Sequence, residues 1–324
     1  MKAVIIDKPG GPEALRLAEN FQTPTMEASK ILIKTKFSGV NYIDTYFRSG
    51  LYPAPTPLVI GYEGVGEVVE IGSTNPYGLR RGDIVAWMEP GTYAEYAAVS
   101  VDKVVKVPSG ISSEQAAGSF LMGLTTLTLV KEAYEVKKGD VILVHAAAGG
   151  VGLLLCQVLK SIGATVIGTA STKEKCDSAL ANGATHMIDY RQYIDWVTEV
   201  KKFAPEGVNC VYDGVGKDTW EGSLDVVRRK GSVIFFGSAS GPPPPLDIQR
   251  LGKKVTKITR AVVFNYIATR EELEYYSGLL FEHLKNQSLR VHVHKIYDLK
   301  DAKQAHNDLE GRLTSGKSLI RVSQ

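Results

Sequence analysis

A glycine-rich turn near the middle of the chain is the first feature that could do chemistry. The stretch HAAAGGVG, residues 145–152, follows an apolar run and precedes an apolar helical pattern. Gly149 would let the backbone approach a pyrophosphate, and Gly152 would let the helix pack closely on the strand. The helix start offers N–H groups and a positive dipole end to phosphates. Ala147 replaces the first glycine of the dinucleotide pattern, which makes the turn slightly less tight. We predict a dinucleotide site here rather than a purely structural turn.

The residues after the next strand indicate which dinucleotide would bind. An NAD-selective site would place Asp or Glu about 20 residues further on, against the ribose 2′-hydroxyl. The strand instead ends in GTAS, without an acid. The polar residues that follow this strand and the next are Ser171, Lys173, Lys175, Tyr190 and Arg191. They suit a 2′-phosphate, and lysines are unfavourable at a helix start unless an anion is near. The sequence therefore favours NADPH, with mere decoration of a helix start as the alternative for the lysines.

Alternating strands and helices would position this turn. After a helical pattern over 112–136, apolar strands are expected over 140–146, 165–171, 186–189, 208–216 and 232–241. Helices are expected between them, over 152–163, 173–183, 195–204 and 218–231. This alternation is typical of a doubly wound parallel sheet with right-handed crossovers. The run GPPPPL then predicts a stiff surface loop.

The first hundred residues have a different pattern. Short β-rich runs are bounded by Gly, Pro or Asn, with no helix expected between them, which predicts a barrel-like or sandwich β-domain. The tail carries an amphipathic helix over 269–287, then a strand over 293–299, a helix over 301–312 and a last strand over 318–322. The simplest architecture is an α/β nucleotide-binding domain inserted into a β-rich domain that the tail completes.

Composition narrows the class of protein. A chain of 324 residues with a net charge of +3 allows about two domains and argues against a nucleic-acid coat or a membrane-surface protein. The three cysteines form no Cys-x-x-Cys pair, which suits a reducing compartment and argues against a zinc lobe or disulfide framework. The N-terminus is expected to form a first strand rather than a signal peptide, and no apolar run is long enough for a membrane span. We expect a cytoplasmic protein.

Several stretches together carry a family resemblance. They are GVNYIDTYFRSGLYP, GYEGVGEVVEIG, HAAAGGVG, DGVGKDTWEGSL and FFGSASG. They resemble the zinc-free quinone oxidoreductase and zeta-crystallin branch of the medium-chain dehydrogenase/reductase superfamily, nearly end to end. The resemblance implies a GroES-like catalytic domain over 1–121 and 265–324, a Rossmann NADPH-binding domain over 122–264, and a cleft between them. It also implies a homodimer joined mainly through the cofactor domains.

The zinc alcohol dehydrogenases of the same superfamily give a contrast. Where they carry a cysteine and a His-Glu pair, this chain has Tyr42, then Tyr62 and Glu63. A catalytic zinc needs about three thiolate, imidazole or carboxylate ligands, which these positions do not supply. No cysteine precedes Cys156, so the four-cysteine lobe is also missing. Hydride transfer is therefore expected to proceed without a metal.

The resemblance also implies site residues. Asn41, Tyr46 and Tyr52 would lie at the nicotinamide end, the tyrosines as proton donors or oxyanion partners and Asn41 fixing the geometry. Packing alone is the alternative for the tyrosines, because a quinone can take its proton from water. The implied cofactor contacts are Asn41, Tyr46, Thr125, Gly149, Gly150, Val151, Ser171, Lys175, Tyr190, Phe236, Gly237, Ser238, Phe264 and Arg312.

Three functions remain open from the sequence. The first is an NADPH:quinone oxidoreductase. The second is an NADPH-dependent reductase of α,β-unsaturated carbonyls or enoyl thioesters, because both kinds of acceptor are flat and would lie over the same nicotinamide. The third is a protein that binds AU-rich RNA, as relatives of the zeta-crystallin type do. The modest charge and the lack of an RNA-recognition motif make RNA a secondary partner at most, with the basic run at 250–260 as its one candidate surface.

Overall fold

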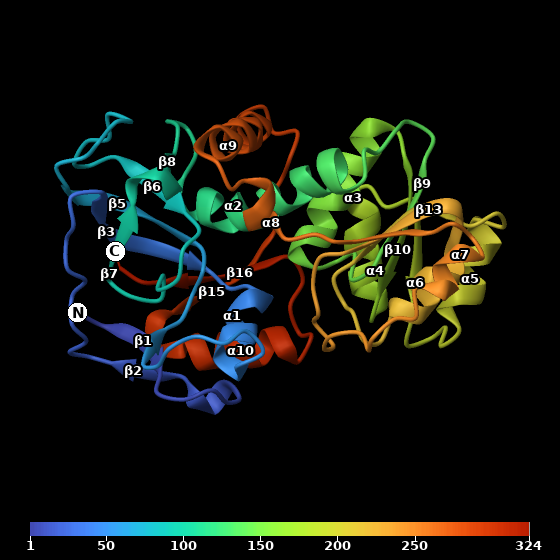
Figure 1. The fold of residues 1–324 in the computed structure, drawn as a ribbon, viewed down its shortest axis with the longest axis horizontal. Helices are drawn as coiled ribbons and strands as arrows, with labels where there is room; N and C mark the ends of the chain where they lie inside the picture. Colours follow the sequence, from blue (N-terminus) through green and yellow to red (C-terminus); the bar gives the residue numbers. More distant parts are fainter. Residues whose placement is uncertain (324) are drawn as a thin grey trace. The chain divides into compact units, whose positions relative to one another are not determined.

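The computed structural model describes residues 1–323, which form two compact units (Figure 1). The first unit comprises Met1–Leu121, Ile267–Gln287 and the residues from Val291 onward. The second comprises Met122–Tyr266 with Ser288–Arg290. The chain therefore leaves the first unit after Leu121, builds the second, and returns.

The second unit is built on a six-stranded sheet in which every neighbouring pair is parallel. Its strands, in spatial order, are β11 (His186–Asp189), β10 (Thr165–Ala170), β9 (Val141–Val144), β12 (Val208–Asp213), β13 (Val227–Phe235) and β14 (Lys257–Arg260). The chain runs outward from β9 to β11 and then crosses to β12 on the other side. This order confirms the predicted doubly wound sheet, with its topological switch point between β9 and β12.

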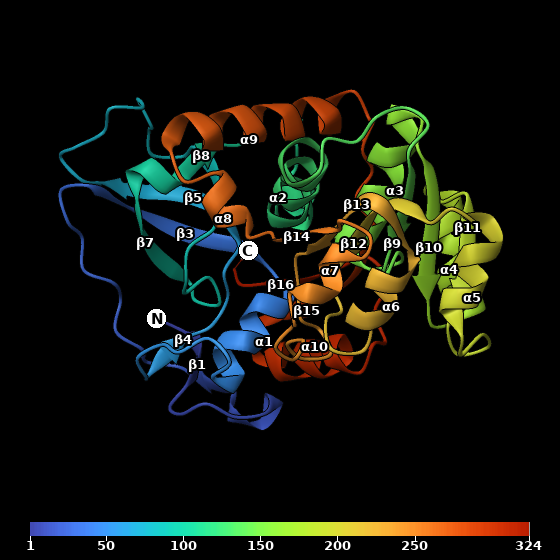
Figure 2. The same ribbon diagram turned by 45° about the vertical axis from the view of Figure 1, so that its right-hand side comes forward.

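Helices flank this sheet, as Figures 1 and 2 show. They are α3 (Gly150–Ile162), α4 (Lys173–Ala181), α5 (Trp196–Phe203) and α6 (Trp220–Val226), with the short α7 (Gln249–Gly252) and α8 (Val263–Tyr266). On one face, Leu143, Ile167 and Val211 are buried against Val200 of α5 and Leu224 of α6. Strands covered on both faces explain the nearly continuous apolar runs in this part of the sequence.

The boundary between α6 and β13 differs from the prediction. The helix expected over 218–231 ends at Val226, and Val227 already belongs to β13. Val227 pairs with Val208, and pairing resumes at Ser232 opposite Cys210 after a register irregularity. Parallel pairing with the buried β12 thus outweighs the helix-favouring Arg-Arg-Lys sequence between these points.

The first unit contains two sheets. The larger has the order β15 (Val293–Asp298), β16 (Lys317–Arg321), β3 (Lys30–Gly39), β5 (Gly64–Ile71), β6 (Ile84–Trp87) and β8 (Val104–Lys106), with β7 (Tyr96–Ser100) also on β3. The smaller has β2 (Arg16–Ala18), β1 (Ala3–Ile6) and β4 (Leu58–Val59). The returning segment adds α9 (Arg270–Lys285), α10 (Ala302–Glu310) and the last two strands of the larger sheet. The C-terminal segment therefore completes the β-rich unit, as predicted.

The expectation that the first hundred residues contain no helix is wrong. Helix α1 (Tyr42–Ser49) lies between β3 and β4. Asn41 is its N-cap, and the Asp44 carboxylate accepts the Asn41 backbone N–H at 2.8 Å. Gly50 ends the helix with a left-handed φ of 81°. These cap residues stood in the sequence, and they compensate for the many β-prone residues of the segment.

Helix α2 (Ser113–Thr128) begins in the first unit and ends in the second, followed by a short π-helical turn over Leu129–Ala133. Within residues 1–323, no helix combines the length and apolar character needed to span a membrane.

Candidate functional site

The turn from β9 into α3 is closely packed at two glycines. A Cβ at Gly149 would lie 3.2 Å from the Ala146 carbonyl oxygen, and one at Gly152 would lie 2.7 Å from the carbonyl carbon of Ala147. Gly149 is the N-cap of α3 and makes no side-chain cap, so the first N–H groups of the helix lack intrahelical acceptors. Such a helix start fits a pyrophosphate group.

The structure shows how this turn tolerates alanine at positions 146 and 147. Ala146 adopts the left-handed conformation, with φ of 51°, so the unusual backbone geometry falls on this alanine. Ala147 is fully buried, and a Cβ at Gly168 on β10 would lie 2.7 Å from its methyl carbon. The missing side chain at Gly168 therefore makes room for the methyl group that replaces the usual glycine.

Two predicted phosphate-binding residues follow neighbouring strands. Ser171 comes directly after β10 and Tyr190 directly after β11, where Ala170 pairs with Asp189. The Tyr190 backbone N–H donates to the Ala170 carbonyl at 3.0 Å, so the two strand ends are held together. Lys175 lies in the first turn of α4, where its backbone N–H donates to the N-cap Thr172 at 3.3 Å.

The two lysines of this helix start differ. Lys173 forms an ion pair with Asp177, one helical turn later, at 2.6 Å. This pairing accounts for Lys173 without a bound phosphate, so it matches the simpler alternative for that residue. The phosphate hypothesis therefore rests on Lys175 rather than on both lysines.

The loops after β12 and β13 also approach each other closely. Phe236 donates its backbone N–H to the Asp213 carbonyl, and a Cβ at Gly237 would lie 2.6 Å from the Gly214 carbonyl oxygen. The Asp213 carboxylate accepts the N–H groups of Val215 and Gly216, each at 2.9 Å. The predicted stretch Phe236–Ser238 thus lies at the same carboxyl edge as Gly149, Ser171 and Tyr190.

A buried polar network that was not predicted from the sequence lies beneath this edge. The Ser223 hydroxyl donates to Asp213 at 2.9 Å, so the His145 Nε2–H donates to Ser223 Oγ and Nδ1 accepts from Thr169. Burial lowers the pKa of His145, which favours this neutral ring. The network ties the ends of β9, β10 and β12 to α6. An Asp following an apolar strand in the stretch DGVG was the available signal.

Two further predicted contacts lie elsewhere in the second unit. Thr125 is on α2 and nearly buried, and Phe264 is on α8, which follows the end of β14.

In the first unit, the structure brings the two predicted tyrosines together. The Tyr46 and Tyr52 rings lie edge to face with centroids 5.3 Å apart, and the Tyr52 backbone N–H donates to the Tyr46 carbonyl. Phe47 contacts Tyr52 at 5.6 Å and stacks on Tyr62 at 4.8 Å. We call Tyr46, Phe47, Tyr52 and Tyr62 the aromatic cluster. It provides flat apolar surfaces carrying hydroxyl groups.

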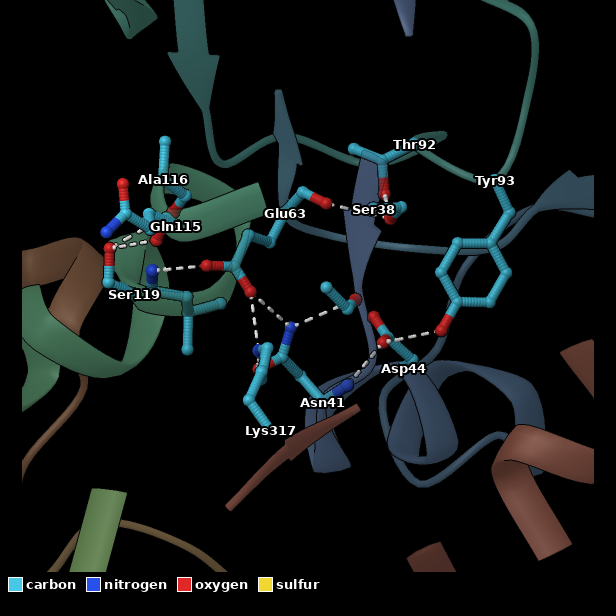
Figure 3. Close-up of polar contacts among 12 residues, drawn as sticks. Ser38, Asn41, Asp44, Glu63, Thr92, Tyr93, Gln115, Ala116, Ser119 and Lys317 are labelled. Atoms are coloured by element: carbon cyan, nitrogen blue, oxygen red, sulfur yellow. Dashed lines mark hydrogen bonds and ion pairs between the residues drawn. The ribbon is translucent and has the colours of Figure 1, made fainter. Parts of the chain in front are cut away.

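Asn41, at the start of the same helix, is held by two charged side chains (Figure 3). Its Oδ1 accepts from the Lys317 ammonium at 2.5 Å, while its Nδ2 donates to the Glu63 carboxylate at 3.0 Å and to the Gly39 carbonyl at 3.2 Å. Both N–H groups of the amide are therefore engaged within the protein. These bonds fix the orientation of the Asn41 amide at the start of α1.

Comparisons with known proteins bear on both units. The family models described as "Alcohol dehydrogenase GroES-like domain" and "Zinc-binding dehydrogenase" match residues 27–109 and 150–280. A quinone oxidoreductase of Salmonella typhimurium is 43% identical over 322 residues, covering 97% of each chain. The chain belongs to the quinone oxidoreductase branch of the medium-chain dehydrogenase/reductase family.

Solved structures and a second kind of relative extend this assignment. The crystal structure of Escherichia coli quinone oxidoreductase complexed with NADPH matches with a TM-score of 0.96 at 40% identity, over 99% of this chain and all of that one. A 2-haloacrylate reductase of Burkholderia sp is 34% identical over 331 residues, covering 98% of each chain. The predicted combination of a Rossmann sheet with a GroES-like β-domain is confirmed.

Because related enzymes of this family bind zinc, the side chains that could ligate a metal can be compared with the family's zinc site. Among the side chains of residues 1–323, no group of three or more His, Cys, Asp or Glu is arranged to hold a metal ion. Glu63, which stands at the glutamate position of the zinc enzymes' His-Glu pair, forms its ion pair with Lys317 at 2.6 Å. Tyr42, at the position of the zinc enzymes' cysteine, donates its hydroxyl hydrogen to the Leu309 carbonyl near the end of α10. Arg312 follows this helix with a left-handed φ of 58°.

Asp44 heads a second buried chain of hydrogen bonds in the first unit. Arg48 donates to His306 Nδ1 at 3.0 Å, so the proton of the neutral ring lies on Nε2, which faces the Tyr93 hydroxyl at 3.3 Å. Tyr93 in turn donates to Asp44 Oδ2 at 3.2 Å. Burial lowers the pKa of His306 to about 3 and raises that of Asp44 to about 7. Glu310 pairs with Arg48 at 2.7 Å, so this series of hydrogen bonds joins α1 to α10.

Proposed function

We propose that this protein is an NADPH-dependent quinone oxidoreductase that transfers hydride from the nicotinamide to a quinone. The observation that carries the proposal is the carboxyl edge of the second unit's sheet. There, the glycine-containing turn into α3 is followed by two neighbouring strands, β10 and β11. Ser171 follows β10, which ends without an acid, and Tyr190 follows β11. The relatives named quinone oxidoreductase, and the NADPH complex among the solved structures, support the same function.

NADPH, when bound, supplies the hydride. The N–H groups of Gly149, Gly150 and Val151 would hold the pyrophosphate, and Ser171, Lys175 and Tyr190 the 2′-phosphate. The remaining proposed contacts are Thr125, Phe236, Gly237, Ser238, Phe264 and Arg312, together with Asn41 and Tyr46 at the nicotinamide end. These residues orient the cofactor and exclude water from it.

The aromatic cluster would receive the acceptor. A flat quinone packs well against the faces and edges of aromatic rings. Tyr46 and Tyr52 are the proposed donors to the quinone oxygen as it gains negative charge. Asn41 sets the position of α1 and so of these two rings. No metal takes part in this proposal.

A second candidate function is reduction of α,β-unsaturated carbonyl or carboxyl compounds. The 2-haloacrylate reductase at 34% identity favours it, because its substrate is a conjugated acceptor of the same flat kind. The same cofactor residues and aromatic cluster would serve this reaction.

The test is a comparison of acceptors at fixed enzyme and cofactor. Oxidation of NADPH is followed with an ortho-quinone, a para-quinone, a 2-enal and crotonyl-CoA, and repeated with NADH. We expect turnover with a quinone and a strong preference for NADPH. Turnover with the conjugated carbonyls alone would establish the second candidate instead. Binding of NADPH without turnover of any acceptor would exclude both.

The proposal includes a homodimer in the cytoplasm. Strand β14 ends the six-stranded sheet, so its outer edge is available to pair with the same strand of a second copy. Cys156, Cys176 and Cys210 are all free, as a reducing compartment allows. Light scattering after size-exclusion chromatography tests the dimer: a monomer mass at assay concentrations would contradict it.

A further inference from the structure

We propose that Glu63 and Lys317 are positioning residues for the reaction: their buried ion pair holds both α1, which leads into the tyrosines, and α2, which carries Thr125. This inference rests on the proposed function, since the tyrosines and Thr125 are assigned there to the acceptor and the nicotinamide.

The pair is fully enclosed by the protein. Glu63 is 0% exposed and Lys317 is 2% exposed, with Lys317 Nζ 2.6 Å from Glu63 Oε2. Gly39 makes room for it, because a Cβ there would lie 2.7 Å from the Glu63 carboxyl carbon and 2.8 Å from Lys317 Cε. Burying two charges is expensive, and apolar residues of similar size often give equal stability. A role in positioning neighbouring elements, rather than in stability, would account for the two buried charges.

The first element held by the pair is α1. Lys317 donates to Asn41 Oδ1, and Glu63 accepts from Asn41 Nδ2. The two charged groups therefore fix the orientation of the Asn41 side-chain amide. The Asn41 backbone N–H is thereby presented to the Asp44 carboxylate, which caps the helix. Tyr46 lies on this helix and Tyr52 follows it.

The second element is α2, which the other carboxylate oxygen reaches (Figure 3). Glu63 Oε1 accepts the backbone N–H of Leu121 at 2.6 Å, in the middle of the helix. The Ser119 hydroxyl donates back to the Gln115 carbonyl at 2.7 Å, a contact that often accompanies a bend. Leu121 is the last residue of the first unit's N-terminal segment, and Thr125 lies about one turn later on the same helix. One carboxylate thus fixes the two elements assigned to the acceptor and the nicotinamide.

The experiment compares Glu63→Gln, Lys317→Met and the double variant. Each single variant leaves one buried charge unpaired and should lower Tm. The double variant removes both charges and should recover most of the Tm. Its kcat for the quinone should nevertheless stay about tenfold to hundredfold below wild type, because a displacement of about 1 Å in a reacting group has this effect. Its Kd for NADPH should change little, since the phosphate-binding residues are untouched.

Lys106→Met is the matched control. Lys106 ends β8, is more exposed than Lys317, and pairs at 2.6 Å with Asp83, which directly precedes β6; neither residue belongs to the proposed site. Its loss should leave kcat unchanged.

The near-ultraviolet circular dichroism of the aromatic cluster supplies a readout independent of turnover. If the double variant recovers both Tm and kcat with a wild-type spectrum, the pair is merely structural and the inference is wrong. If the wild type itself turns over no acceptor, the proposed function fails. In that case a changed aromatic spectrum in a stable double variant still supports the positioning of the rings, and an unchanged one contradicts it.

Discussion

At the scale of single residues, Asp44 is a carboxyl group whose two oxygens differ. Oδ2 accepts from Asn41 and Tyr93, whereas Oδ1 is buried and makes no hydrogen bond within residues 1–323. Burial disfavours the charged form and raises the pKa to about 7, although the Asn41 hydrogen bond and the Lys317 charge act in the opposite direction. The folded protein therefore retains a proton on Asp44 that the unfolded chain releases near its usual pKa of 3.8.

This difference predicts a pH dependence of stability. Between about pH 4 and pH 7 the folded state binds more protons, so the free energy of unfolding falls as pH rises through this window. A shift from 3.8 to about 7 corresponds to about 4 kcal/mol. Asp44→Asn removes the group, so the variant should gain stability relative to wild type by up to this amount between pH 4 and pH 8. Urea unfolding at a series of pH values measures the difference. A difference that stays constant with pH would mean that Asp44 is charged in the folded state.

The tyrosine hydroxyls carry the second prediction at this scale. Tyr46→Phe and Tyr52→Phe keep the edge-to-face ring packing but remove the proposed donors. A hydrogen bond to a charged oxygen is worth about 1.5–3 kcal/mol, so kcat/KM for the quinone should fall by about tenfold to hundredfold. Tyr275→Phe, on α9 and outside the aromatic cluster, is the control and should stay near wild type. Unchanged rates in all three variants would assign the rings to packing alone, with water as the proton source.

At the scale of elements, the turn into α3 makes a sharp steric prediction. In Gly152→Ala the new methyl carbon would lie 2.7 Å from the backbone of Ala147, so α3 must move away from β9. We expect unfolding free energy to fall by about 1–3 kcal/mol. The Kd for NADPH should rise at least tenfold, because the helix start no longer meets the pyrophosphate. Isothermal titration and urea unfolding measure the two effects.

Gly278→Ala in α9 is the matched control for that change. A Cβ there meets no atom within 4 Å, and the residue lies within a helix. Removing a helical glycine at such a site should raise stability by about 0.5–1 kcal/mol without changing the Kd for NADPH. If both variants behave alike, the close approach of α3 to β9 is not what the glycine serves.

The elements also show which parts of the fold the sequence could predict. The strands and helices around the turn were predictable because buried parallel strands leave long apolar runs separated by helical periods. Helix α1 was missed although Asn41, Asp44 and Gly50 are cap residues, because the β-rich surroundings outweighed a short signal. The extent of β13 depends on its pairing with β12, which is set by residues distant in sequence. The Glu63–Lys317 pair joins positions 254 residues apart, and no local pattern could reveal it.

At the scale of the whole molecule, the insertion of one unit into the other links cofactor binding to stability. The proposed phosphate-binding residues all lie in the second unit, so NADPH should stabilise that unit first. At a concentration one hundred times its Kd, NADPH should add about 2.7 kcal/mol to the free energy of unfolding. NADH at the same concentration should add far less, because it cannot engage Ser171, Lys175 and Tyr190 through a 2′-phosphate.

A comparison of variants at Lys175 and Lys173 distinguishes a specific phosphate contact from general attraction by the positive charge at the start of α4. Loss of a charge-assisted hydrogen bond in Lys175→Ala should weaken NADPH binding by tenfold or more, which reduces the added stability to about 1.4 kcal/mol or less at the same concentration. Lys173 is already paired with Asp177, so Lys173→Ala should keep nearly the full gain. Thermal and urea unfolding with and without each nucleotide measure these differences. Equal losses in the two variants would show that the helix start attracts the phosphate only through its overall charge, and equal stabilisation by NADH and NADPH would remove the 2′-phosphate site from the second unit altogether.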